Sequence, residues 1–128
     1  MKSIVKTLTN EEIYRRALEL NTCFNDNEKY FPAAVSFAIQ KNKANLIDLA
    51  GDIETGRMNI IQHYGVAQED GNFNIADENV PAANQELVDL LSITQDVKLF
   101  LFGIESLDDI KLTSQEMQAI MFMIDEDC

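Results

Sequence analysis

Tryptophan is absent from this chain of 128 residues, and histidine, proline and cysteine are scarce, with one, two and two residues. Cys23 and Cys128 lie far apart in the sequence, so we expect free thiols rather than a disulfide that staples the fold. The longest stretches without Asp, Glu, Lys or Arg have eleven residues, Tyr30 to Gln40 and Met58 to Gln68. Because a membrane-spanning helix needs roughly 20 apolar residues, no membrane contact is expected.

Basic residues are also few, and they are unevenly placed. The chain has 10 Lys and Arg against 22 Asp and Glu, a formal net charge of −12. Residues 1 to 65 carry eight acidic and eight basic side chains, whereas residues 66 to 128 carry fourteen acidic and two basic ones. Phosphate contacts need clustered Lys and Arg, so direct binding of nucleic acid is not expected. The acidic half is either solvated or faces a basic partner.

The size and composition favour one folded unit. With 128 residues, of which 46% are hydrophobic, the chain falls in the single-domain range, and we predict one domain over residues 1–128. The start of the sequence, Met1-Lys2-Ser3-Ile4, lacks the apolar run and cleavage site of a secretory signal. We therefore expect a soluble protein inside a cell, or part of a particle assembled there.

Local signals predict two helices in the first half. Thr9 and Glu12 have the spacing of a capping box, which predicts a helix from about Asn10, and the preceding residues 4–8 are typical of an edge strand. From Pro32 to Tyr64 no proline intervenes, and an apolar stripe follows the segment, interrupted at Asn42 and Arg57. A continuous helix would be about 50 Å long and would overhang a compact domain. Gly51 and Gly56 leave a bend or break open as the alternative, because glycine weakens helix interiors.

The second half mixes a hairpin, a strand and two helices. The segment Glu69-Asp70-Gly71-Asn72 predicts a hairpin turn, and Pro81 opens a helix. Residues 97–102 are apolar apart from Lys98, so this strand is either central or completed by another chain. Thr113 and Glu116 form a second capping box before a last helix. We predict a predominantly α-helical α+β fold: an antiparallel helical hairpin over about 10–65 and a small acidic lobe over about 66–128.

The apolar residues near the end of the chain are the first candidate site. From Met117 to Ile124 the only polar residue is Gln118, so the segment cannot hide on one stripe of a surface helix. We predict burial on two sides, with a partner or a second copy covering one of them; methionine also fills cores, which is the alternative. The predicted partner interface comprises Met117, Ile120, Met121, Phe122, Met123, Ile124, Phe100 and Phe102.

Clustered carboxylates form the second candidate site. Asp125, Glu126 and Asp127 follow the last helix at the end where negative charge opposes the helix dipole, so we consider contact with a basic partner beside plain solubility. Asp108 and Asp109 are adjacent in a loop and join this predicted acidic partner surface. Weak cation binding is a minor alternative, since adjacent acids are usually solvated.

Residues suited to catalysis are few. His63 lies beside Tyr64 and Gly65, where packing or a contact with the helix C-terminus explains it, and Cys23 lies beside apolar Phe24 with nothing to lower its pKa. Neither a phosphate-binding glycine motif nor a calcium loop is present. We expect no enzyme activity, no cofactor and no metal.

The order of these segments resembles families of short, uncharacterised proteins encoded by bacteriophages and prophages. The resemblance rests on the capped first helix, the long helix ending at Tyr64-Gly65, the turn at 69–72, the helix over 84–91 and the closing segment 112–117. It implies a phage context, in which small non-enzymatic chains serve virion assembly or block host defence. The location it implies is the host cytoplasm, with association with the virion left open.

Two functions follow from these expectations. The first is an assembly protein of a phage-like particle that binds copies of itself or structural subunits, and so forms oligomers. The second is an inhibitor whose acidic half imitates nucleic acid and blocks a basic host protein such as a defence nuclease. Regularly spaced surface acids would favour imitation, and acids scattered around apolar surface would favour assembly.

Overall fold

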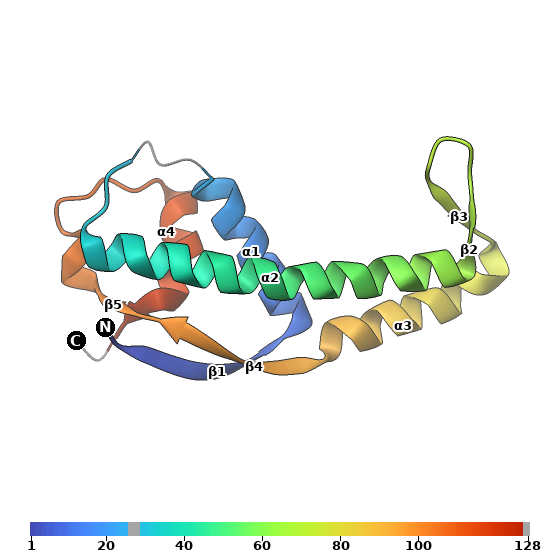
Figure 1. Ribbon diagram of the computed structural model, residues 1–128, viewed down its shortest axis with the longest axis horizontal. Helices are drawn as coiled ribbons and strands as arrows, with labels where there is room; N and C mark the ends of the chain where they lie inside the picture. Colours follow the sequence, from blue (N-terminus) through green and yellow to red (C-terminus); the bar gives the residue numbers. More distant parts are fainter. Residues whose placement is uncertain (26–28, 127–128) are drawn as a thin grey trace.

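The computed structural model describes residues 1–25 and 29–126, and Figure 1 shows them as an elongated molecule. The fold is predominantly α-helical α+β, as the sequence predicts. No helix in these two ranges is long and apolar enough to cross a membrane. The helices are α1 (Asn10–Cys23), α2 (Ala33–Tyr64), α3 (Val80–Ser92) and α4 (Ser114–Ile120), with short 3-10 helices η1 (Asp77–Asn79), η2 (Ile104–Leu107) and η3 (Met121–Met123). The strands are β1 (Ser3–Thr9), β2 (Gly65–Ala67), β3 (Phe73–Ile75), β4 (Thr94–Phe100), β5 (Phe102–Gly103) and β6 (Ile124–Asp125).

Helix α2 runs unbroken through Gly51 and Gly56, which confirms the continuous helix. Its 32 residues extend about 48 Å at 1.5 Å per residue. Its first part packs in a head with α1, α4 and the strands, and its second part leaves the head alongside α3 (Figure 1). We call residues 51–92 the arm and the remaining described residues the head.

The apolar stripes of α1 and α2 meet in the core of the head. Ile13 and Leu20 of α1, and Val35 and Leu46 of α2, have no exposed surface. The capping box that starts α1 is present, with the backbone N–H of Glu12 donating to Thr9 Oγ1 at 3.1 Å. Local sequence signals therefore position two helices that contribute a large part of the core.

The acidic second half does not form a lobe of its own. Strand β4 pairs antiparallel with β1 over seven residues, from Ser3 opposite Phe100 to Thr9 opposite Thr94, and α4 packs against α1. The hydroxyl of Thr7 donates to the carboxylate of Asp96 at 2.7 Å across this ladder. Residues 66–128 are therefore spread over the arm and the head, because the edge strand β1 takes its hydrogen-bond partner from the far half of the sequence.

Asn42 completes the open edge of β4. Its side chain is fully buried, and it accepts a hydrogen bond from the backbone N–H of Phe100 and donates one to the carbonyl of the same residue, both at 2.9 Å. The apparent gap in the apolar stripe of α2 is thus a polar contact between the long helix and the strand. Strand β4 is not central in a sheet: within the described residues its ladder partner is β1, and Asn42 of α2 covers its other edge at Phe100.

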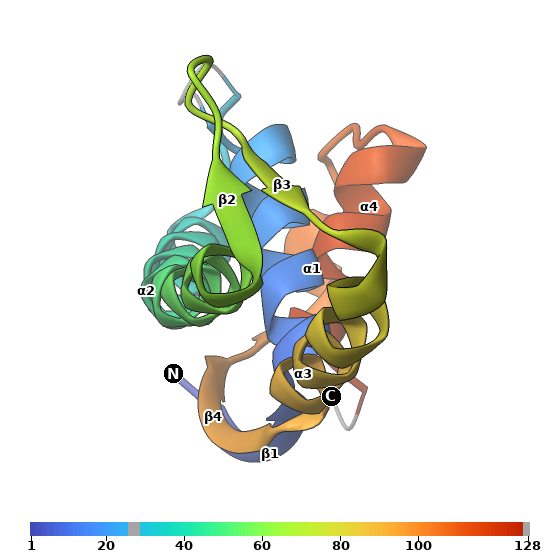
Figure 2. The ribbon, with the colours of Figure 1, turned by 90° about the vertical axis from the view of Figure 1, so that its right-hand side faces the viewer.

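The arm consists of α2 and α3 side by side, with the β2–β3 hairpin at its end. Figure 2 shows this hairpin standing off the helix axes, and its turn contains Gly71 with a φ of 85°. A Cβ atom on Gly56 would lie 3.2 Å from Cδ1 of Leu90, so the glycine lets α3 approach closely. The second part of α2 extends beyond the head, as the predicted overhang requires, and α3 covers one side of it.

Candidate functional site

The predicted apolar interface is only partly on the surface. Phe102 is 4% exposed, and Ile120 and Met123 have no exposed surface, so these three do not belong to a partner interface. The reason is local: α4 ends at Ile120, and the chain turns through η3 into β6, which pairs with β5, so the apolar run faces several directions inside the head. Met121 is 61% exposed. The remaining four are partly exposed, namely Phe100, Met117, Phe122 and Ile124.

The predicted acidic surface is also divided. Asp125 is 6% exposed, and its Oδ2 lies 3.0 Å from Lys2 Nζ, so it serves the fold rather than a partner surface. Asp108, Asp109 and Glu126 are exposed. Asp127 lies outside the described residues. The closing carboxylates therefore do not act as one group.

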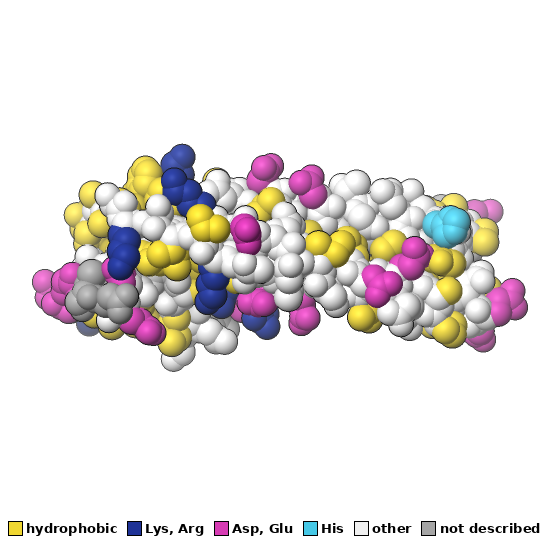
Figure 3. Space-filling view, turned by 90° about the horizontal axis from the view of Figure 1, so that it is seen from below, with side chains coloured by type: hydrophobic (Ala, Val, Ile, Leu, Met, Phe, Trp, Pro, Cys, Tyr) yellow, Lys and Arg dark blue, Asp and Glu magenta, His cyan; other side chains and the backbone are white. Residues whose placement is uncertain are grey.

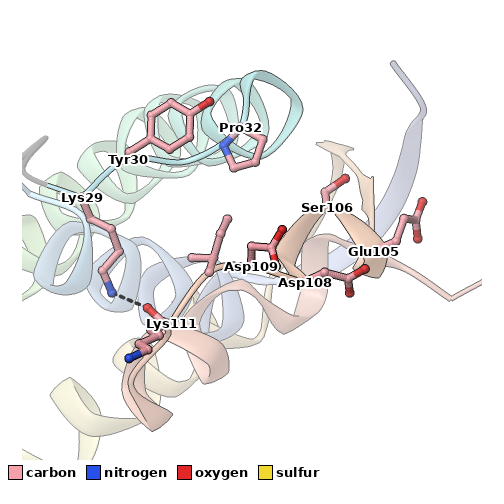
Figure 4. Close-up of a pocket in the computed structure, with 9 residues that line it drawn as sticks. Lys29, Tyr30, Pro32, Glu105, Ser106, Asp108, Asp109 and Lys111 are labelled. Atoms are coloured by element: carbon pink, nitrogen blue, oxygen red, sulfur yellow. Dashed lines mark hydrogen bonds between the residues drawn. The ribbon is translucent and has the colours of Figure 1, made fainter.

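Asp108 and Asp109 line an open groove at the end of the head, of about 630 Å³. Figure 4 shows Tyr30 and Pro32 on one side and the carboxylates of Asp108 and Asp109 on the other. At its opposite end Lys29 Nζ donates to the carbonyl of Lys111 at 2.8 Å. Side chains of both signs line this groove, so it is not a purely acidic surface. Among the described residues, no group of three or more His, Cys, Asp and Glu is placed to hold a metal.

A second groove lies where α1, α2 and α3 meet, and we call it the three-helix groove. Its volume is about 300 Å³. Exposed Tyr14 and Leu18 of α1 form one wall, and the charged side chains at its rim are Glu11, Arg15 and Arg57. The other apolar walls are Ile53 of α2 and Leu87, Leu90 and Leu91 of α3. This groove is not among the predicted sites; its signal in the sequence is the pair of large hydrophobic residues, Tyr14 and Leu18, beside the buried stripe of α1.

One ion pair lies within α2 at the rim of the three-helix groove. Arg57 donates from Nε and Nη2 to the two carboxylate oxygens of Glu54, at 2.9 and 2.6 Å. These hydrogen bonds hold the pKa of Glu54 below its usual value and raise the pKa of Arg57. The hydroxyl of Tyr14 also donates to Glu54, at 3.4 Å. The charge of Arg57 is therefore already matched within the chain.

Aromatic and basic side chains meet on the head beside β4. The rings of Phe37 and Phe100 contact each other edge to face, with centroids 5.7 Å apart. Lys41 Nζ lies 5.9 Å from the Phe37 centroid, and Lys98 Nζ lies 5.3 Å from the Phe100 centroid. Each lysine therefore forms a cation–π contact with a neighbouring ring.

The two residues considered for catalysis lie in different parts of the molecule. Cys23 ends α1 in the head, and burial, followed by Glu116 and Glu19, raises its pKa, which reduces the thiolate fraction needed for attack. His63 lies at the far end of α2 in the arm, where its ring contacts Tyr64 edge to face at 4.7 Å. The fold does not bring this thiol and this imidazole together (Figure 1).

Charge is segregated along the molecule. The arm, residues 51–92, has eight acidic residues and a single basic one, Arg57, whereas nine of the ten Lys and Arg lie outside it. Figure 3 shows Lys and Arg gathered over the head on the face seen from below, with acidic side chains along the arm and at both ends. The chain thus presents a strongly acidic projection on a head of mixed charge.

Comparison of the chain with models of known protein families, with curated protein sequences and with solved structures gives no match in any of the three.

Proposed function

We propose that this chain is a non-enzymatic protein–protein interaction protein that contributes to the assembly of a phage-like particle. The observation that carries the proposal is the arm. Of residues 51–92, only Ile53 and Ala83 are buried, so the arm adds little to the core while it adds much surface. A projection of this kind, acidic and two helices wide, suits contact with another protein better than it suits stabilisation of the head.

The surface of the arm favours a partner with basic side chains around apolar ones. Its acids alternate with exposed hydrophobic residues: Val66 is 68% exposed, and Val88, beside Asp89, is 56% exposed. Protein interfaces combine an apolar centre with a polar rim. Opposite charge on the partner would also speed the encounter and make it sensitive to salt.

A pull-down from the native source tests the proposal. The wild-type chain is compared with an arm variant, Asp77→Lys/Glu78→Lys, and a head variant, Asp108→Lys/Asp109→Lys, which makes the same change of charge at exposed positions. We expect the wild type and the head variant to capture particle subunits and the arm variant to lose them. Thermal melts establish that all three are folded. Capture of the same subunits by the arm variant would contradict the proposal.

Imitation of nucleic acid is the second candidate, and the negative charge of the arm is the observation in its favour. The acids lie on separate elements, with Glu69 and Asp70 at the hairpin, Asp77 and Glu78 in η1, and two more in α3. This scatter, with exposed valines between the acids, favours assembly. Competition separates the two: duplex DNA displaces the chain from the captured partner if the chain occupies a nucleic-acid site, and leaves an assembly complex intact at the same ionic strength.

A further inference from the structure

The three-helix groove is an open apolar surface at the junction of head and arm. Leu18 is 58% exposed and Tyr14 is 38% exposed, although both lie beside a groove with apolar walls. They are four residues apart on α1, so they lie on the same face, next to each other. Exposed apolar side chains beside an apolar groove are typical of surfaces that are covered in an assembly.

The charges around this groove cancel, unlike those of the rest of the chain. Glu11 and Arg15 are exposed one turn apart on α1, and no ion pair involves either of them among the described residues. Arg57 is matched by Glu54. In a chain of net charge −12, a neutral apolar surface is where two copies approach with the least repulsion.

We propose that the three-helix groove is a two-fold interface between two copies of this chain. A two-fold contact uses the same patch on both copies, so the patch must be complementary to itself. With the two α1 helices antiparallel, Glu11 of each copy faces Arg15 of the other. Leu18 then reaches toward the apolar walls of the facing copy. Glu11 and Arg15, together with the apolar surface between the helices, therefore make the patch complementary to itself.

A second copy suits the site better than a small ligand. About 300 Å³ is the lower limit for ligand pockets, which bury most of their ligand, whereas this groove is open between α1 and α3. Leu18 protrudes from the surface, and the surface of a second protein can cover it. The interface goes beyond the proposed function, because it names the groove at the base of the arm rather than the acidic surface of the arm, and a second copy of the chain as its partner.

Sedimentation velocity tests the position of the interface. We expect the wild type to be dimeric at tens of micromolar and Leu18→Glu to be monomeric, since it places charge in the apolar centre. Val88→Glu is the matched control: Val88 is 56% exposed but lies outside the groove, so this variant stays dimeric. Circular dichroism establishes that both variants are folded.

Charge reversal tests the pairing. Glu11→Arg places Arg against Arg15 of the other copy, and Arg15→Glu places Glu against Glu11, so each single variant weakens its own dimer about tenfold or more. An equimolar mixture of the two single variants restores opposite charges at both contacts and recovers a dimer as tight as that of the wild type. A role of these residues in folding alone would not produce recovery on mixing.

Three results would overturn the inference. They are a wild-type monomer at tens of micromolar, a dimer that Leu18→Glu leaves intact, and failure of the mixed charge variants to associate. None of them bears on the acidic surface of the arm, whose partners are identified by the separate pull-down, so the two proposals fail independently.

Discussion

Asn42 gives the sharpest test of how the long helix is joined to the strand. It is fully buried and forms two 2.9 Å hydrogen bonds with the backbone of Phe100. Asn42→Leu keeps the size of the side chain approximately constant but removes both its donor and its acceptor. The N–H and C=O of Phe100 then lose their partners in a partly buried position.

The magnitude follows from the cost of unsatisfied polar groups. Each buried donor or acceptor without a partner costs about 1–3 kcal/mol, so two partly buried groups reduce the free energy of unfolding by about 2–4 kcal/mol. With an unfolding entropy of about 2.1 cal/mol/K per residue, a loss of about 3 kcal/mol lowers Tm by about 10 °C for a chain of this length. The fold should survive with a lower melting temperature, because the surrounding apolar residues accept a leucine.

Urea denaturation and thermal melts followed by circular dichroism measure the effect. Asn45→Leu is the control, since Asn45 is an exposed residue one turn further along α2, and its free energy of unfolding should change by less than about 0.5 kcal/mol. If the two variants had equal stability, or if Asn42→Leu matched the wild type, the hydrogen bonds would not be what joins α2 to β4.

Three further predictions concern local features. A methyl group at Gly51 meets nothing within 4 Å, so Gly51→Ala should raise the free energy of unfolding by about 1 kcal/mol, whereas Gly56→Ala should gain less because its methyl group crowds Leu90; urea titration compares the two. Thr9→Ala removes the cap of α1 and should cost about 1 kcal/mol by the same measurement, and an unchanged urea midpoint would refute the cap. A hydrogen bond from Lys29 lowers the pKa of Glu116, so its carboxylate stabilises the fold above the unfolded pKa of about 4.3, and this contribution is lost as the pH falls through the lower folded pKa. Glu116→Gln should therefore be less stable than the wild type at pH 7, with a difference that shrinks in acid; a pH-independent difference would argue against it.

Features signalled by nearby residues were predictable from the sequence. Both capping boxes, the start of α3 at Pro81 and the hairpin at Gly71 appear where the sequence indicates. Each depends on side chains within three or four residues of the backbone groups that they satisfy. Two glycines oppose an unbroken α2, and packing against α1 and α3 outweighs their cost.

Features that depend on distant parts of the chain were not predictable in the same way. The pairing of β1 with β4 joins segments about 90 residues apart, and nothing in either strand identifies the other. The excess of acidic residues after position 65 predicts a separate acidic lobe. The distribution of charge along the sequence does not determine which strands pair, and the hydrogen bonds between β4 and β1 place part of the acidic half in the head. The apolar residues from Met117 predict a single helix that is too hydrophobic to lie on a surface. Amino-acid composition does not show that the chain changes from α4 to η3 and then to β6 within this run.

The position of the three-helix groove links the two proposals physically. Leu90 lines the groove and also packs where Gly56 lets α3 approach α2, at the base of the arm. A second copy seated in the groove would therefore contact α1 of the head and both helices of the arm at once, and would hold the arm in one orientation relative to the head. Two-fold symmetry would then give each dimer two acidic arms. A partner with repeated basic sites would bind such a pair more tightly than it binds a single copy, because the second contact forms within the same complex. The groove variant Leu18→Glu should accordingly weaken capture of a multivalent partner while each arm keeps its own affinity.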